Sequence, residues 1–235
     1  MNILLFSAEE LSASGQLSLT DRRAEHLRKV LKAQAGDDIR VGQINGEMGT
    51  ARLLDINEER ARLEVTLNAE APPPLDLTLI LALPRPKMMR RVIQSTVSLG
   101  VKRIYLINSY KVEKSYWQTP WLEAASLKEN CLLGLEQGVD TVLPEIHMRK
   151  LFKPFVEDEL SQIIAGSDAW VAHPTSEAQS PQVNGPLTLA VGPEGGFTPY
   201  EVKKLEEIGF KGFTLGKRIL RVETVIPALI GKLYL

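Results

Sequence analysis

The sequence predicts an α/β protein with a small N-terminal β-barrel followed by a larger domain built on a parallel sheet. Early in its 235 residues, short runs of alternating apolar and polar side chains predominate, which is typical of half-buried strands. Later, unbroken apolar runs alternate with helical segments and glycine loops, which is the pattern of βαβ units. Pro72–Pro74 forms a short stiff spacer between the two patterns. We therefore expect two domains and a linker, at residues 1–70, 75–235 and 71–74.

The N-terminal part is predicted to be mostly strand. It opens with the run NILLF at residues 2–6, and a helix is expected from about Asp21 to Lys32. Three alternating runs follow, with the sequences IRVGQI, TARLLDI and ARLEVTL. Residues 45–46 and 57–59, Asn-Gly and Asn-Glu-Glu, form the turns between them. A single helix among several strands indicates a small β-barrel.

The C-terminal part opens with the apolar run LDLTLILAL, which the sequence Pro-Arg-Pro at residues 84–86 ends. A helix is expected over Met88–Leu99, because its apolar side chains recur at helical spacing, and Gly100 ends it. The run RIYLI is the next strand and completes a β-α-β unit. A long helical segment follows over about 120–137, and DAWVA, just ahead of His173, is a further strand.

The most informative stretch lies at residues 187–223. LTLAV is a short unbroken apolar run, which suits a strand buried in a parallel sheet. Gly192–Gly196, with the sequence GPEGG, ends this strand with residues that permit close backbone approach. Thr198 and Glu201 then form a capping box for a helix, and a second short strand leads to another tight turn at Gly216. Two glycine turns at the carboxyl ends of parallel strands predict a ligand crevice.

Two common phosphate-binding loops are excluded at this crevice. A P-loop needs a lysine followed by serine or threonine after its second glycine, whereas Phe197-Thr198 follows Gly196 here. The dinucleotide fingerprint is also absent, since no loop in the sequence has the G-x-G-x-x-G spacing. The ligand of this crevice is therefore not bound by a P-loop or by a dinucleotide-binding loop.

VGPEGGF followed by LGKRILRVET resembles the paired signature of the SPOUT methyltransferases, specifically the RsmE-type 16S ribosomal RNA uridine-N3 methyltransferases. The resemblance implies a trefoil knot made by the C-terminal helix, S-adenosylmethionine bound among the knot loops, and a homodimer whose substrate site draws on both subunits. The N-terminal pattern D-x4-HL-x2-VL-x4-GD, from Asp21 to Asp37, is similar to the same family and implies a PUA-like RNA-binding domain.

The cofactor is expected to lie against the loops that follow three of the strands. The His-Pro pair is assigned by the resemblance, and a strand-end turn without a ligand is its alternative. The glycines leave room for backbone amides and carbonyls, while the apolar residues offer a wall for the adenine. The residues expected to bind S-adenosylmethionine are His173, Pro174, Val191, Gly192, Gly195, Gly196, Leu215, Gly216, Ile219 and Leu220.

Methylation at N3 of uridine requires the loss of a weakly acidic imide proton, which leaves negative charge on the ring carbonyls. A fixed cation stabilises such charge with little reorganisation, and Arg221 is the residue expected to do so. Glu194 or Glu223 is expected to accept the proton or to orient Arg221. The alternative for both glutamates is a carboxylate that satisfies loop amides. No metal is expected to take part.

The net charge of the chain is only −1, so its overall composition does not indicate nucleic-acid binding. From Arg85 to Lys114, however, eight basic residues stand against a single acidic one. This segment is either a phosphate-contacting surface or a solvated helix face. On the first interpretation, the residues expected to contact ribosomal RNA are Arg85, Lys87, Arg90 and Arg91.

Other features bear on location and assembly. Cys131 is the single cysteine, so no internal disulfide forms, which suits a reducing cytoplasm. The sequence has no basic leader and no apolar run long enough to span a bilayer, so we expect a cytoplasmic protein without a membrane partner. The last helix is expected to begin at 222–224, with Pro227 close to its first turn. Its sequence TVIPALIGKLYL is apolar nearly all round, so we expect it to contribute to a homodimer interface.

Three departures from the family pattern leave a second hypothesis open. Ser98 stands where the family usually has glutamate, Asp140 stands near the expected arginine, and Lys217 replaces a proline. The first hypothesis is an S-adenosylmethionine-dependent methyltransferase acting on 16S ribosomal RNA. The second is a non-catalytic RNA-binding or ribosome-assembly protein that keeps the fold. The two glycine loops and Arg221 favour the first hypothesis.

Overall fold

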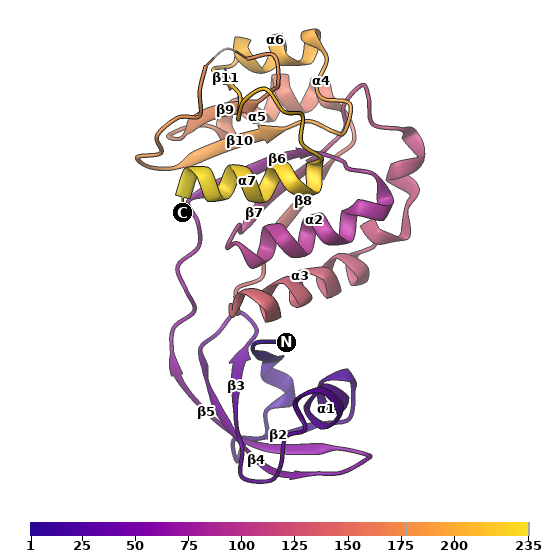
Figure 1. Ribbon diagram of the computed structural model, residues 1–235, viewed down its shortest axis with the longest axis vertical. Helices are drawn as coiled ribbons and strands as arrows, with labels where there is room; N and C mark the ends of the chain where they lie inside the picture. Colours follow the sequence, from indigo (N-terminus) through magenta and orange to yellow (C-terminus); the bar gives the residue numbers. More distant parts are fainter. Residues whose placement is uncertain (177, 235) are drawn as a thin grey trace. The chain divides into compact units, whose positions relative to one another are not determined.

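The computed structural model describes residues 1–176 and 178–234 and divides into two compact units (Figure 1). The first unit comprises residues 1–73 together with 132–143, and the second unit takes the rest of the described chain. The helix α3, Ala124–Gly138, therefore contributes its last residues to the first unit. The domain limits expected from the proline spacer remain a prediction.

The first unit is built on a curled five-stranded sheet, as the alternating runs predict (Figure 1). Its strand order is β1-β3-β4-β5-β2, with β1 parallel to β3 and the other neighbours antiparallel. Buried side chains such as Phe6, Leu17 and Leu63 form its core. The bounds are Leu4–Phe6 for β1, Gln16–Leu19 for β2, Asp38–Gln43 for β3, Met48–Ile56 for β4 and Ala61–Ala69 for β5.

The helical segment of the first unit lies where the sequence predicts it. Helix α1 covers Arg22–His26 and continues as a π-helical turn at Leu27–Leu31. Asp21 caps this helix, because its side chain accepts a hydrogen bond of 2.8 Å from the backbone nitrogen of Arg23. Strand β2 and a 3-10 turn at Ala8–Glu10 are not indicated by the sequence, since each is too short to establish a period.

The second unit is built on a six-stranded sheet whose neighbouring strands are all parallel. The strand order is β11-β9-β10-β6-β7-β8. Strands β6 and β10 pair with Leu187 opposite Leu77, and all their residues are buried, as their unbroken apolar runs predict. The bounds are Leu77–Ala82 for β6, Arg103–Ile107 for β7, Glu145–Arg149 for β8, Asp168–Ala172 for β9, Leu187–Val191 for β10 and Lys211–Phe213 for β11.

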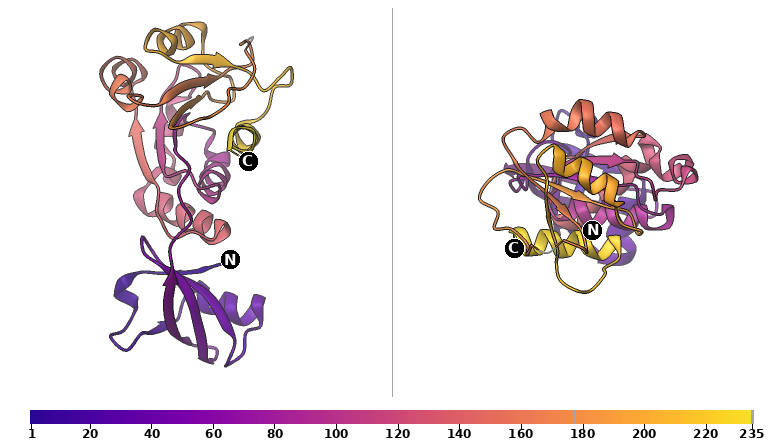
Figure 2. Two further views of the ribbon diagram at one scale, coloured as in Figure 1. Left: turned by 90° about the vertical axis from the view of Figure 1, so that its left-hand side faces the viewer. Right: turned by 90° about the horizontal axis from the view of Figure 1, so that it is seen from above.

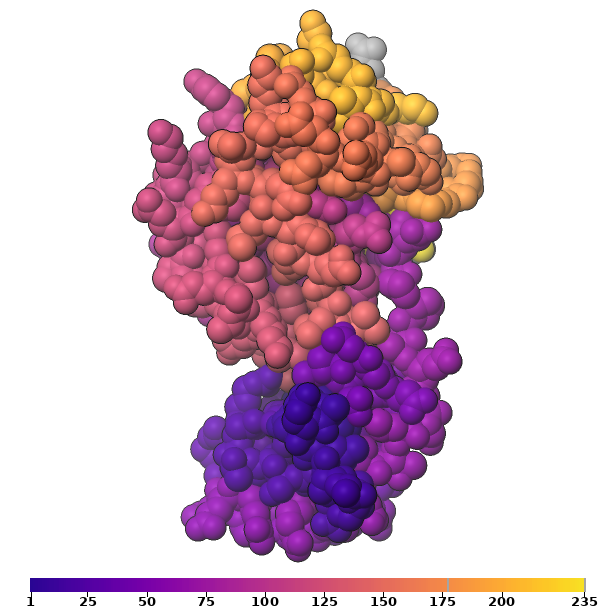
Figure 3. All heavy atoms as spheres, turned by 180° about the vertical axis from the view of Figure 1, so that it is seen from behind, coloured from indigo at the N-terminus to yellow at the C-terminus, as the bar shows by residue number. Residues whose placement is uncertain are grey.

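Helices cover both faces of this parallel sheet. Helices α2 and α7 lie on one face, and the segment that contains α4 and α5 lies on the other (Figure 1, Figure 2). Seen from behind, this second segment spreads over the face of the second unit (Figure 3). The bounds are Pro86–Ser98 for α2, Phe152–Pro154 for α4, Leu160–Ile163 for α5, Pro199–Glu207 for α6 and Val222–Tyr234 for α7. The α/β fold with a parallel sheet is thus confirmed.

Helix boundaries mostly agree with the sequence patterns. The buried residues of α2 are those that the helical spacing predicts: Met89, Val92, Ile93, Thr96 and Val97. The next long helix begins at Ala124 rather than near Pro120, because Pro120–Leu122 form a separate 3-10 turn capped by Thr119. Helix α7 begins at Val222 as expected, and Pro227 lies inside it, just past the first turn. Among the described residues, no helix is both long enough and apolar enough to cross a membrane.

Candidate active site

A cavity of about 620 Å³ lies where β9, β10 and β11 end. The loops that follow these strands and the start of α6 line most of it, and Lys111 joins them from the loop after β7. The structure brings together all ten residues that the sequence assigns to the cofactor, since each of them lines this cavity: His173, Pro174, Val191, Gly192, Gly195, Gly196, Leu215, Gly216, Ile219 and Leu220. Their binding role remains a prediction, but their common location is a finding.

The glycine-rich turn after β10 lines the cavity. A β-carbon added to Gly192 would lie 2.8 Å from the backbone nitrogen of Phe197, so only glycine fits there. Gly196 has a positive φ of 69°, and its nitrogen donates a hydrogen bond of 2.7 Å to the carbonyl of Pro193. This turn is therefore tightly closed, as the GPEGG sequence predicts.

The helix α6 begins at a capping box that also reaches a neighbouring loop. Thr198 and Glu201 satisfy each other's backbone amides, which confirms the predicted cap. The Glu201 side chain is buried, and its Oε1 accepts a hydrogen bond of 2.7 Å from the backbone nitrogen of Tyr110. The carboxylate thus joins the start of α6 to the loop after β7.

Glu194 holds a loop amide in the structure. Its Oε1 accepts a hydrogen bond of 3.0 Å from the backbone nitrogen of Arg85, at the start of α2. Glu194 also lines the cavity. The geometry gives weight to the alternative in which this carboxylate satisfies loop amides, and a catalytic role for Glu194 remains a prediction.

His173 links the loop after β9 to the turn after β10. Its Nε2 lies 3.3 Å from the carbonyl oxygen of Phe197, and its Nδ1 lies 2.8 Å from Oγ1 of Thr175. Because a carbonyl oxygen only accepts, Nε2 carries a proton and donates it to Phe197, while Nδ1 pairs with the Thr175 hydroxyl. The imidazole therefore braces the cavity wall with both of its nitrogens.

Arg221 does not line the cavity, although Leu220 and Val222 on either side of it do. Its side chain is 86% exposed, and its Nη1 lies 3.9 Å from Oε1 of Glu223. Its backbone carbonyl accepts hydrogen bonds from Thr224 and Val225 and so starts α7. The catalytic assignments of Arg221 and Glu223 remain predictions about the complex with substrate, in which this exposed side chain is free to reorient.

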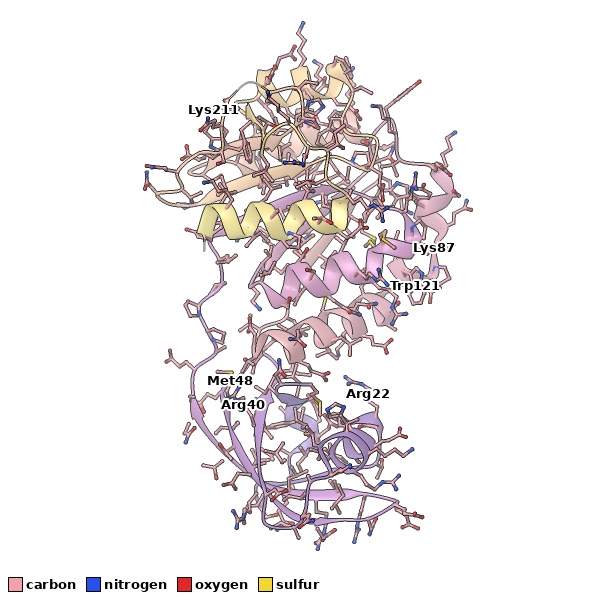
Figure 4. The ribbon with its side chains drawn as sticks, viewed as in Figure 1. Arg22, Arg40, Met48, Lys87, Trp121 and Lys211 are labelled. Atoms are coloured by element: carbon pink, nitrogen blue, oxygen red, sulfur yellow. The ribbon has the colours of Figure 1, made fainter. Side chains whose placement is uncertain are left out.

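The basic segment that the sequence singles out is divided by the fold. Arg85, Lys87, Arg90 and Arg91 are exposed at and after the start of α2, on the side of the sheet where β6 ends. The guanidinium carbon of Arg90 lies 4.8 Å from the centroid of the Trp121 ring. Lys87 and Trp121 lie on the same side of the second unit (Figure 4). Arg103 is instead the first residue of β7, at the opposite end of the strands.

The structure adds residues that sequence reasoning gave no place in the cavity. Among them are the cationic side chains of Lys111, Lys203 and Arg218. The ammonium of Lys111 donates a hydrogen bond of 2.6 Å to the carbonyl oxygen of Gly195. The sequence counts Lys111 in the basic segment, but contains no signal that this residue meets a loop so far along the chain. Within the described residues there is no cluster of His, Cys, Asp and Glu that could hold a metal ion.

Comparison with known proteins places nearly the whole chain among RNA methyltransferases. The family model described as an RNA methyltransferase domain matches residues 71–233, and that of an RNA methyltransferase PUA domain matches residues 19–66. The ribosomal RNA small subunit methyltransferase E of Treponema pallidum is 30% identical, over 97% of this chain and 88% of that protein. The enzyme of the same name from Synechocystis is 29% identical, over 97% of this chain and 76% of that protein.

Solved structures agree with this result. The ribosomal RNA small subunit methyltransferase E from Neisseria gonorrhoeae, bound to S-adenosyl methionine, is 26% identical and has a TM-score of 0.73, covering 99% of this chain and 96% of that one. A methyltransferase from Legionella pneumophila has a TM-score of 0.74 at 20% identity, covering 98% and 96%, and shows the shared fold. The chain therefore belongs to the ribosomal RNA small subunit methyltransferase E family of RNA methyltransferases, the RsmE-type branch of the SPOUT fold with a PUA-like domain.

Proposed function

We propose that this protein methylates N3 of a uridine in 16S ribosomal RNA, with S-adenosylmethionine as the methyl donor. The observation that carries the proposal is the cavity at the ends of β9, β10 and β11, where the ten residues assigned to the cofactor meet. The names of the relatives supply ribosomal RNA of the small subunit as the substrate class. The uridine and its N3 atom come from the resemblance of the two loop sequences alone.

The residues of the cavity fit an adenosyl compound. The volume of about 620 Å³ lies within the usual range of about 300–1,000 Å³ for small-molecule sites. Leu215, Ile219 and Leu220 give an apolar wall that remains exposed and so is available to a purine ring. The Gly192–Gly196 turn brings backbone donors and acceptors to the cavity, because its three glycines carry no side chains of their own. This pairing of apolar surface with backbone polar groups suits adenine beside a ribose and an amino acid.

S-adenosylmethionine, when bound, supplies a methyl group that its sulfonium already activates, so the protein mainly aligns the partners. Arg221 is proposed to stabilise the negative charge that develops on the uracil carbonyls. Glu223, 3.9 Å from Arg221, is proposed to orient the guanidinium. Glu194 lines the cavity and is proposed to accept the imide proton while it also holds the amide of Arg85.

The RNA is proposed to contact, through its phosphates, the exposed cations at and after the start of α2: Arg85, Lys87, Arg90 and Arg91. The PUA-like first unit is proposed to add further RNA contacts. We further propose that the protein acts as a homodimer in the cytoplasm. The net charge of −1 limits non-specific attraction to RNA, so these contacts are local rather than a property of the whole surface.

The proposal is tested in two steps. S-adenosylmethionine should bind the purified protein and raise its melting temperature, because a ligand held only by the folded state stabilises it by mass action. Nucleosides from 16S ribosomal RNA of a strain that lacks the protein are then analysed by mass spectrometry, and 3-methyluridine should be missing at one position. Cofactor binding without any lost methyl group would favour the alternative of a non-catalytic RNA-binding or ribosome-assembly protein.

A further inference from the structure

We propose that Lys111 is a positioning residue for the donor site: its ammonium holds the Gly195 carbonyl and thereby sets the affinity for S-adenosylmethionine. The inference rests on the proposed function, in which the cavity takes this cofactor. Lys111 lies in the loop after β7, whereas the three loops that the sequence assigns to the site follow β9, β10 and β11.

The contact between Lys111 and Gly195 is both polar and steric. Nζ of Lys111 lies 2.6 Å from the Gly195 carbonyl oxygen, and a hydrogen bond with an ionised donor is stronger than one between neutral groups. A β-carbon added to Gly195 would lie only 2.7 Å from Cδ of Lys111. The alkyl chain of the lysine therefore lies against the space that a side chain at position 195 would fill.

The backbone around Lys111 is fixed, which sets this residue apart from an ordinary surface lysine. On one side, the nitrogen of Tyr110 donates to Glu201, whose side chain is only 2% exposed. On the other side, Val112 is buried, and its nitrogen donates a hydrogen bond of 3.0 Å to the carbonyl of Ser109. Less conformational entropy is lost when a long side chain is presented from an ordered backbone than from a mobile loop.

Loss of the Lys111 ammonium would change the conformation of the Gly192–Gly196 turn, which is proposed to contact the cofactor. Gly195 and Gly196 are the most permissive residues of the chain at this point, and Gly196 already has a positive φ of 69°. Without the ammonium, the peptide between them keeps only the hydrogen bond from the Gly196 nitrogen to Pro193, so the turn spends less time in its binding-competent form. The apparent dissociation constant rises in inverse proportion to the fraction of time that the turn spends in this form. Turnover with saturating cofactor changes little, because binding then selects the same form.

Lys111→Met tests this inference, since it keeps the alkyl chain and removes the charge. We expect the dissociation constant for S-adenosylmethionine to rise about tenfold, with the KM for the cofactor rising in parallel. The turnover number at saturation and the melting temperature of the free protein should stay near the wild-type values. Lys111→Arg, which keeps a donor, should restore most of the affinity. Lys128→Met, at an exposed lysine of α3 outside the cavity, is the matched control and should bind normally.

A double-mutant cycle tests the contact itself. Gly195→Ala should weaken cofactor binding about tenfold, because the new methyl group displaces the lysine chain. In the background of Lys111→Ala, where Cδ is gone, the same substitution should cost less than about threefold. If the wild type binds S-adenosylmethionine, the inference is overturned by additive effects of the two substitutions on affinity. A normal affinity of Lys111→Met would overturn it as well. A wild-type protein that binds no S-adenosylmethionine would instead remove the proposed function.

Discussion

The carboxylate of Glu201 accepts a hydrogen bond of 2.7 Å from the backbone nitrogen of Tyr110, although 91 residues separate the two along the chain. The same carboxylate caps α6 by accepting from the nitrogen and the hydroxyl of Thr198, each at 2.8 Å. A residue that the sequence identifies only as part of a local capping box thus also fixes a loop from the neighbouring part of the sheet. Lys111, the next residue of that loop, lines the cavity.

We predict that Glu201→Gln destabilises the protein although it keeps the shape of the side chain. One of the two oxygens becomes an amide that donates, so either the Tyr110 or the Thr198 nitrogen loses its acceptor. An unsatisfied buried donor costs about 1–3 kcal/mol of unfolding free energy. Denaturant unfolding measures this loss, and cofactor affinity should fall with it because the loop of Lys111 loosens.

Glu207→Gln, at the end of the same helix, is the control for this substitution. Glu207 is exposed and pairs with Lys204 on the surface, so its loss should cost less than about 1 kcal/mol. Equal effects of the two substitutions would mean that the buried carboxylate of Glu201 has no special role.

Local features of the site follow from the sequence, and the structure confirms them. The GPEGG turn, the capping box and the buried face of α2 each depend on residues within a few positions of one another. Steric limits on glycine and the helical period act over the same short range, so they are visible in the sequence alone. Five of the six strands of the parallel sheet follow likewise from short apolar runs alternating with helices.

Features that join distant parts of the chain could not be predicted. The pairs Lys111–Gly195 and Glu194–Arg85 depend on which strands lie side by side, and no local pattern encodes that order. Strand β8 is also missed, because this edge strand has mixed polar and apolar side chains and no clear period. The exposed position of Arg221 is a property of the loop conformation. The threading of the C-terminal helix into a knot stays an expectation from the family resemblance and does not follow from any pattern in the residues.

We predict that Arg221→Ala lowers turnover by about a hundredfold or more, the usual cost of removing one group that stabilises charge in the transition state. The affinity for S-adenosylmethionine should change much less, because Arg221 lies outside the residues that line the cavity. Arg221→Lys should also be slow, since an ammonium lacks the planar fork of donors. Single-turnover methylation and calorimetry on the same samples separate the two effects.

Lys217→Ala is the matched control, because this exposed cation belongs to the same loop and does not line the cavity. Its turnover should stay near that of the wild type. If Arg221 merely braces the loop, its removal lowers the melting temperature and the cofactor affinity together with the rate. Normal turnover of Arg221→Ala would end the catalytic assignment.

We predict that Cys131 lowers the stability of the fold in alkaline solution. Burial raises the pKa of its thiol from an ordinary 9.0 to about 11. Above pH 9 the unfolded state therefore binds fewer protons than the folded state, so the free energy of unfolding falls as the pH rises from 9 to 11. The full shift corresponds to about 3 kcal/mol at most.

Chemical denaturation of the wild type and of Cys131→Ala at several pH values measures this contribution. Both proteins lose stability in alkali for other reasons, so the informative quantity is the difference between their free energies of unfolding. This difference should narrow above pH 9. The folded thiol should also resist a disulfide reagent at pH 8, because its side chain is only 3% exposed. If the difference in unfolding free energy did not change with pH, the raised pKa of the Cys131 thiol would be contradicted.

The final prediction concerns assembly through helix α7. Val222, Ile226, Leu229 and Ile230 are buried within the protomer, where α7 packs against α2. The expected homodimer interface would therefore use the other, half-buried side of α7, and Leu235 at its end lies outside the described residues. Light scattering at micromolar concentration should give a mass of twice 26.1 kDa.

Gly231 offers a specific way to test this interface. A β-carbon added there meets no atom within 4 Å beyond its own helix backbone, so the isolated protomer has space where a side chain would begin. Gly231→Glu places a charge in the contact that the dimer would need and should give a mass of 26.1 kDa, while the helix itself loses nothing, because glycine is the poorer helix former. Gly231→Ala should remain dimeric or nearly so. A single-protomer mass for the wild type would refute the homodimer, and a Gly231→Glu protein that stays dimeric would place the interface elsewhere than on this side of α7.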